Sequence, residues 1–343
     1  MQPETTAPGW QQGRLAKGLP EQWRGPLALL LAGALALIAV TFREWGEMAH
    51  QWWNIDTYTH ILIVPVIIAW LFLIKAEELA KLSPRLWLPG LAVVAAGLAL
   101  WLVGRASGIN IIAHAGAVGA LQGMVIAALG PRVSAFLALP LCFGALLVPF
   151  GDEFIPALQS MTADIAVALT HWSGIPAEVD GIYIDTPVGL FIVAEACSGV
   201  RFLVAMITLA VLVCFTRFNS WKRRALFMLA SIIVPIIANG IRAWGTIYIA
   251  QSQGVEFAAG FDHIFYGWIF FAIVVAVLLA AAWRYFEREP EDYGWTPGEI
   301  EGLTALQRFD GKAASPAVIL AGLAGLAIMA AIVATIVGPA AIG

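Results

Sequence analysis

Cys197 is the residue whose type and setting best suit nucleophilic chemistry. It stands where an acidic stretch runs into a long apolar one, in the sequence Glu195-Ala196-Cys197-Ser198-Gly199-Val200-Arg201. The pattern predicts Cys197 in the first turn of a helix, where the helix dipole and free N–H groups favour a thiolate. Arg201 lies four residues further on and shares that helix face, so it either adds positive charge near the sulfur or pairs with Glu195.

Arg242 is the second candidate because it is a charged residue inside an apolar run, 225–250. It lies about 10 Å from the end of that run, at roughly 1.5 Å per helical residue. Charged side chains within a membrane span are costly and are functional hypotheses by default. Asn239, three residues earlier, shares its helix face. The alternative is a structural arginine that pairs with a carboxylate.

His263 supplies the third chemical function, a general base. It stands with Asp262 at the start of the apolar run 264–283. A neutral imidazole near a membrane surface can take the proton of a thiol, and Asp262 or Glu195 can orient the ring. The simpler interpretation is a helix cap or a surface group. His60, at the start of another apolar run, is a second-rank candidate.

The composition places this chemistry in a membrane. The chain has 343 residues, of which 60% are hydrophobic and 12% charged, and its mean hydropathy is +0.83. Soluble domains carry roughly 25% charged residues. The net charge of −4 gives no basic surplus for nucleic acid. Disorder, an ordinary cytosolic enzyme and a nucleic-acid binder are therefore excluded, and an integral membrane protein is indicated.

The three cysteines form neither a disulfide framework nor a Cys-x-x-Cys pair, so no metal is expected. Cys142 and Cys214 lie in apolar surroundings typical of inert buried thiols. The sequence implies no soluble cofactor.

Nine runs are apolar enough to be candidate membrane spans. They cover residues 26–42, 60–75, 87–104, 110–129, 133–150, 198–216, 225–250, 264–283 and 317–338. The predicted fold class is therefore an all-α polytopic membrane protein with about eight to nine transmembrane helices.

The distribution of Lys and Arg predicts a cytoplasmic N-terminus. With that orientation only Arg43 and Arg105 fall on the outer side, and Arg201 and Arg242 fall inside spans. All other Lys and Arg residues are cytoplasmic. Cys197, Arg242 and His263 then all lie toward the outer side, as the parts of a thiol acyl-transfer site would.

An acidic outer loop, 151–197, contains no Lys or Arg. The apolar spacing over 153–172 predicts an amphipathic helix at the membrane surface. Residues 178–193 are rich in Val, Ile, Tyr and Thr, with breaks at Gly181 and 187–189, and predict a short hairpin of strands. Together these elements would form a small cap on the outer side of the bundle.

At these residues the chain resembles the exosortase/archaeosortase family over roughly residues 26–285. The resemblance rests on Glu195-Ala196-Cys197-Ser198-Gly199 with Arg201, Asn239-Gly240-Ile241-Arg242, His263 with Gly267-Trp268, and Tyr58-Thr59-His60. The expected domains are a cytoplasmic tail (1–25), an exosortase-like transmembrane domain (26–285), a cytoplasmic linker (286–316) and an extra C-terminal transmembrane helix (317–343).

The resemblance implies a multi-pass cysteine transpeptidase or protease of the bacterial inner membrane, with its active site facing the periplasm. Its substrates would be secreted proteins with a C-terminal sorting signal, made of a short motif such as Pro-Glu-Pro, a hydrophobic helix and a basic end. Cys197 would form a thioester, Arg242 and His263 would be the other catalytic residues, and the product would pass to a surface acceptor or to water. Glu195, Ser198, Arg201, Asn239, Asp262 and His60 would support catalysis or bind substrate.

Two other functions remain open from the residues. One is a membrane acyltransferase that carries a lipid acyl group on Cys197. The other is a non-enzymatic transporter or exopolysaccharide-export component in which Arg242 is an anion site. If the protein is an inert scaffold, Cys197→Ala should change nothing beyond small packing effects. The family itself is often linked to exopolysaccharide production.

Overall fold

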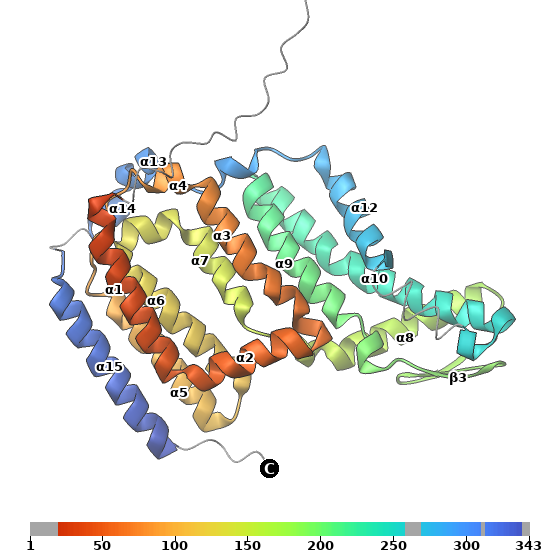
Figure 1. Ribbon diagram of the computed structural model, residues 1–343. Coiled ribbons are helices and arrows are strands. Elements are labelled where there is room, and N and C mark those ends of the chain that lie inside the picture. Colours follow the sequence, from red (N-terminus) through yellow and green to blue (C-terminus); the bar gives the residue numbers. More distant parts are fainter. Residues whose placement is uncertain (1–19, 258–268, 310–312, 338–343) are drawn as a thin grey trace, which may run out of the picture.

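Long apolar runs fold into the helices of a bundle, with a small sheet at one end (Figure 1). The computed structural model describes residues 20–257, 269–309 and 313–337. In that part of the chain, seven helices are long and apolar enough to cross a membrane. They are α1 (Glu21–Val40), the continuous pair η1 (Asp56–Ile63) and α3 (Val64–Ile74), α5 (Gly90–Ser107), α6 (Asn110–Phe136), α9 (Val200–Arg217), α10 (Trp221–Gln253) and α15 (Pro316–Val337). The all-α polytopic fold class is confirmed.

One predicted span differs from the others, and another is described only in part. Over 133–150 the structure has the end of α6, then α7 (Ala138–Gly144) and η2 (Ala145–Leu147). The chain then bends by 66° into η3 (Asp152–Phe154) and α8 (Ile155–Trp172), so these segments form at most one broken span. Pro149 cannot donate a helical hydrogen bond, and Gly151 has a φ of 127°, which explains the bend. In the run 264–283, the described helix is α12 (Phe271–Trp283), of 13 residues.

Helices α5 and α6 form the closest helix pair in the first half of the chain. A Cβ atom on Gly116 of α6 would lie 2.2 Å from the backbone nitrogen of Trp101 on α5. Glycine at this position lets the two backbones approach closely, as small residues do between membrane helices. Helices α1 and α15 pack on this pair and bury Leu37 and Leu323 in the same core.

The acidic segment forms the predicted helix and strands. Helix α8 packs along α10, and β1 (Glu178–Asp180), β2 (Tyr183–Thr186) and β3 (Gly189–Ile192) form an antiparallel sheet in that order. The turns fall at 181–182 and 187–188, at the breaks that the sequence predicts at Gly181 and 187–189. Ile184, paired with Val179 and Phe191, is buried against α8 and α10. The sheet is thereby fixed to the helix pair that carries the candidate site.

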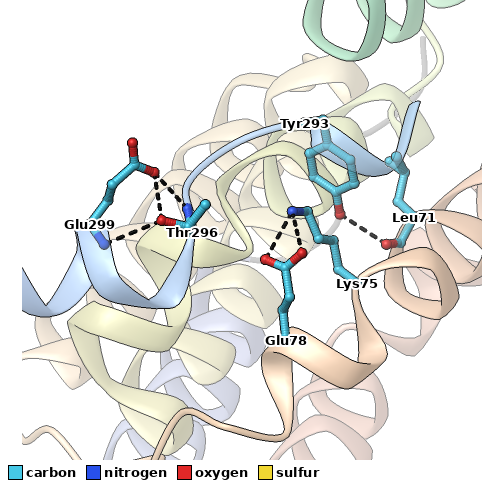
Figure 2. Close-up of polar contacts among 6 residues, drawn as sticks. All are labelled: Leu71, Lys75, Glu78, Tyr293, Thr296 and Glu299. Carbon is cyan, nitrogen blue, oxygen red and sulfur yellow. Dashed lines mark hydrogen bonds and ion pairs between the residues drawn. The ribbon is translucent and has the colours of Figure 1, made fainter. Parts of the chain in front are cut away.

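The segment after α12 is folded onto the bundle rather than extended. It contains η6 (Pro290–Asp292), α13 (Pro297–Gly302) and α14 (Thr304–Gln307). Figure 2 shows the buried Tyr293, which donates a hydrogen bond of 2.9 Å to the carbonyl of Leu71. The ammonium of Lys75 lies 5.5 Å from the Tyr293 ring centroid and pairs with Glu78 at 3.1 Å. A capping box between Thr296 and Glu299 begins α13.

Glu287 closes the N-terminus of α10. Its carboxylate accepts hydrogen bonds from the backbone N–H groups of Asn219 and Ser220, at 2.6 and 2.8 Å. These bonds, that of Ser220 first, lower the pKa of Glu287 from its ordinary value. A lowered folded-state pKa stabilises the fold at neutral pH, and this contribution is lost as acidification passes through that pKa. The same carboxylate pairs with Arg223 at 3.1 Å.

The two ends of the bundle therefore differ in charge. Figure 1 shows α4 (Ala76–Leu79), α13 and the start of α10 at one end. Lys81, Arg217, Lys222 and Arg223 lie in or beside elements at this end. Helix α8 and the sheet, which form the acidic segment, lie at the other end. Cys197 lies five residues after the end of β3, so it belongs to the acidic end.

Substituting Gly116 with alanine should destabilise the protein, because the added Cβ meets backbone that cannot move aside. Over-packing of this kind costs about 1–3 kcal/mol. The measurement is the thermal unfolding midpoint of the purified protein in detergent. Gly119→Ala is the matched control, since its Cβ would find its nearest atom 3.9 Å away on the same helix. Equal midpoints for the two variants would contradict the close approach.

Candidate active site

Cys197 closes a short turn at the junction of the sheet and α9. This turn, η4 (Glu195–Cys197), is held by a hydrogen bond of 2.8 Å from the Cys197 N–H to the Ala194 carbonyl. The thiol-bearing residue is half-buried. The predicted place in the first helical turn is corrected, because Gly199 has a φ of 86° and α9 begins only at Val200. The break lets the turn and the helix take different directions.

Asn239 of α10 joins the Cys197 turn to Arg242. Its side chain is 4% exposed and that of Arg242 is 6% exposed. The Asn239 amide donates 2.8 Å to the Cys197 carbonyl and 2.9 Å to the Thr162 hydroxyl of α8. Arg242 Nη1 donates a hydrogen bond of 3.4 Å to the side-chain oxygen Oδ1 of Asn239. Two predicted residues from separate parts of the chain, Cys197 and Arg242, therefore meet through a third.

Two glycines permit this approach of chain segments. A Cβ on Gly199 would lie 2.7 Å from Asn239 Cγ. A Cβ on Gly240 would lie 2.4 Å from Ile165 Cγ2 on α8. Any larger residue at either position would separate the turn, α8 and α10.

The supporting candidates on the N-terminal side of α9 take other partners than expected. Arg201 pairs with Asp56 of η1 at 3.7 Å and lies over the Phe202 ring, whereas Glu195 is exposed. The Asp56 side chain is 85% exposed, so this ion pair is weak. His60 is half-buried in η1, and its Nδ1 lies 3.0 Å from the Thr57 carbonyl. Of these contacts, only the Arg201–Asp56 pair connects η1 with α9.

Ser198 and Gln159 shape the turn itself. The Ser198 hydroxyl is buried and accepts a hydrogen bond of 3.3 Å from the Val200 N–H, which satisfies a donor at the start of α9. Gln159 of α8 donates 2.7 Å to the Val193 carbonyl and so fixes the chain where it leaves β3. The sequence did not single out Gln159, Thr162 or Asp56. The signal for the first two was their place on the inward stripe of the predicted amphipathic helix.

His263 and Asp262 lie outside the described residues. Their roles as base and orienting group stay predictions from the sequence.

A small pocket lies beside Asn239 and Arg242, and its other walls are apolar. The wall residues are Phe202 of α9, Pro235 and Ala238 of α10, and Phe271 and Val274 of α12. Phe202 and Phe271 are stacked across it, with ring centroids 4.6 Å apart. In the part of the chain that is described, no cluster of three or more His, Cys, Asp or Glu residues is placed to hold a metal ion.

The fold and site define a polytopic membrane protein with a cysteine, an asparagine and an arginine joined at one end of the bundle. Comparison with protein families matches residues 52–280 to the family described as "Transmembrane exosortase (Exosortase_EpsH)". The chain belongs to this family, and membership implies a sorting enzyme that acts on proteins with sorting signals. The match includes Cys197, Arg242 and His263. Comparisons with curated proteins and with solved structures gave no match.

Gly199→Ala should disturb the site more than its backbone strain alone explains. Any L-residue at this φ costs roughly 1–2 kcal/mol, and here the Cβ also displaces Asn239. We expect a lower thermal unfolding midpoint and an altered alkylation rate of Cys197. Gly174→Ala is the matched control, with a φ of 78° and nothing within 4 Å of its Cβ. An unchanged Cys197 alkylation rate in Gly199→Ala would show that Asn239 does not hold the turn.

Proposed function

We propose that this protein is a cysteine transpeptidase or protease that cleaves the C-terminal sorting signal of secreted proteins. The observation that carries the proposal is the contact of Asn239 with both the Cys197 carbonyl and Arg242. This contact connects the backbone of the Cys197 turn to a buried cation, and it supports a site in which a thiolate attacks a carbonyl and a cation stabilises the oxyanion. Family membership supports the substrate class.

The proposed reaction proceeds in two steps. The Cys197 thiolate attacks the scissile carbonyl, Arg242 stabilises the negative charge on its oxygen, and collapse breaks the C–N bond to form a thioester. His263 takes the thiol proton and gives it to the leaving amine. A surface acceptor or water then attacks the thioester carbonyl, donates its proton to His263 and releases Cys197.

The orientation proposed is an N-terminus in the cytoplasm of a bacterium and an active site facing the periplasm. Its support is the separation of basic loops and acidic segment to opposite ends of the bundle (Figure 1). The substrate's hydrophobic helix would lie in the bilayer against the bundle. Tethering in the membrane makes the encounter nearly intramolecular.

Loss of the Cys197 thiol should abolish processing. A secreted reporter with a Pro-Glu-Pro-type signal is co-expressed with wild type, Cys197→Ala or Cys142→Ala, and its intact mass is taken. We expect tail removal with wild type and with Cys142→Ala, whose cysteine is exposed and remote in sequence. The new C-terminal mass distinguishes hydrolysis from transfer to an acceptor. Equal cleavage with Cys197→Ala would refute the thiol mechanism.

Arg242→Lys keeps the charge but loses the planar fork of donors. Removing one donor that stabilises an oxyanion typically lowers the rate by on the order of 100-fold or more, and we expect a loss of that size in the reporter assay. Arg105→Lys is the matched control, because Arg105 is also largely buried and pairs with Glu44 at 3.2 Å on α2 (Phe42–Asn54). Full activity of Arg242→Lys would show that Arg242 contributes only its positive charge.

A further inference from the structure

Thr162 on α8 is a fully buried polar residue that contacts the site from outside the predicted residue set. It is 1% exposed. Its hydroxyl accepts a hydrogen bond of 2.9 Å from the Asn239 amide and donates one of 3.4 Å to the Ser198 carbonyl. One hydroxyl therefore contacts both α10 and the residue after Cys197.

The orientation of the Asn239 carboxamide follows from its partners. The Cys197 carbonyl can only accept a hydrogen bond and the Arg242 guanidinium can only donate one. A flipped amide would therefore place its oxygen against the Cys197 carbonyl oxygen and its N–H groups against those of Arg242. Asn239 Nδ2 must face Cys197, its oxygen must face Arg242, and its second N–H must find an acceptor. The Thr162 hydroxyl is that acceptor.

We propose that Thr162 is a positioning residue for the reaction. It fixes the plane of the Asn239 amide. The amide in turn holds the Cys197 turn and Arg242 in a fixed position relative to each other. This inference rests on the proposed function. Thr162 touches neither the thiol nor a substrate in this scheme. It acts through Asn239 and through the Ser198 carbonyl.

Valine has nearly the shape of threonine but offers no acceptor. In Thr162→Val the second Asn239 N–H would lose its partner in a buried site, and the amide would rotate away from Cys197 to find another. The turn would be released while α8 stays packed. Serine keeps the hydroxyl acceptor without the methyl group, so Thr162→Ser should keep the Asn239 amide in its wild-type position.

Thr170 is a matched control on the same helix. It is fully buried, and its hydroxyl donates 2.7 Å to the Ala166 carbonyl within α8. Thr170→Val removes a buried hydroxyl of the same kind two turns from the site. Any general effect of placing valine in α8 should appear in both variants.

The three cysteines provide a readout that does not need substrate. Cys142 is exposed, Cys197 is half-buried and Cys214 is buried. Membranes containing wild type, Thr162→Val, Thr162→Ser or Thr170→Val are treated with a maleimide, and the modification of each cysteine is followed by mass spectrometry of its peptide. The reporter assay measures processing in the same four proteins and in Cys197→Ala.

We expect Thr162→Val to process the reporter at least about tenfold more slowly, with Thr162→Ser and Thr170→Val within about threefold of wild type. Cys197 alkylation should rise several-fold relative to Cys142 only in Thr162→Val, with Cys214 unchanged. Wild-type processing by Thr162→Val, no rescue by serine, an equal loss in Thr170→Val, or a parallel rise at Cys214 would overturn the proposal. Processing that survives Cys197→Ala would instead refute the proposed function, and the alkylation pattern would still test the role of Thr162.

Discussion

The buried carboxamide of Asn239 constrains the site, because each of its polar atoms must find a partner away from water. A buried amide N–H without an acceptor costs about 1–3 kcal/mol. Asn239 meets this demand with a carbonyl from the Cys197 turn, a hydroxyl from α8 and the guanidinium of its own helix. Asn239 can reach all of these partners only where the Cys197 turn, α8 and α10 come together. Gly199 and Gly240 are the positions at which the backbone gives the required space.

The remainder of the fold supports that meeting point from two sides. Helices α1, α5, α6 and α15 share one core, and the close α5–α6 contact makes it a stable base. Helices α8, α9 and α10 carry the site, and the sheet covers them through Ile184 and its neighbours. The two parts are linked by η1 and α7, which pack with Val211 and Leu212 of α9. The ion pair of Arg201 and Asp56 lies at this junction.

Much of this architecture could be predicted from the sequence, since hydropathy depends on composition over long windows. The spans of the all-α bundle, the helix over 153–172 and the strand breaks at Gly181 and 187–189 are confirmed. The bend at Pro149 and Gly151 falls at the predicted boundary between 133–150 and 153–172, but the extension of α6 to Phe136 was not predicted, because hydropathy over long windows does not locate helix ends. The candidate residues were found from charge and residue type. The contacts between them were not: spacing can place Thr162 on the inward face of its helix, but tertiary packing decides that it meets Asn239, and that Arg201 meets Asp56.

The position of Cys197 at the edge of the apolar bundle bears on how the proposed chemistry would be catalysed. A thiolate deep among apolar side chains would pay a large desolvation cost, while one fully in water would face a weakened field from Arg242. Cys197 is half-buried, and its backbone is linked through Asn239 to the buried Arg242, so its setting lies between these limits. The substrate's apolar helix would contribute its partition into the bilayer to binding, so that few polar contacts are needed to bring the peptide to the site. Fixed dipoles such as the Asn239 amide would then need no reorganisation as charge develops on the carbonyl oxygen.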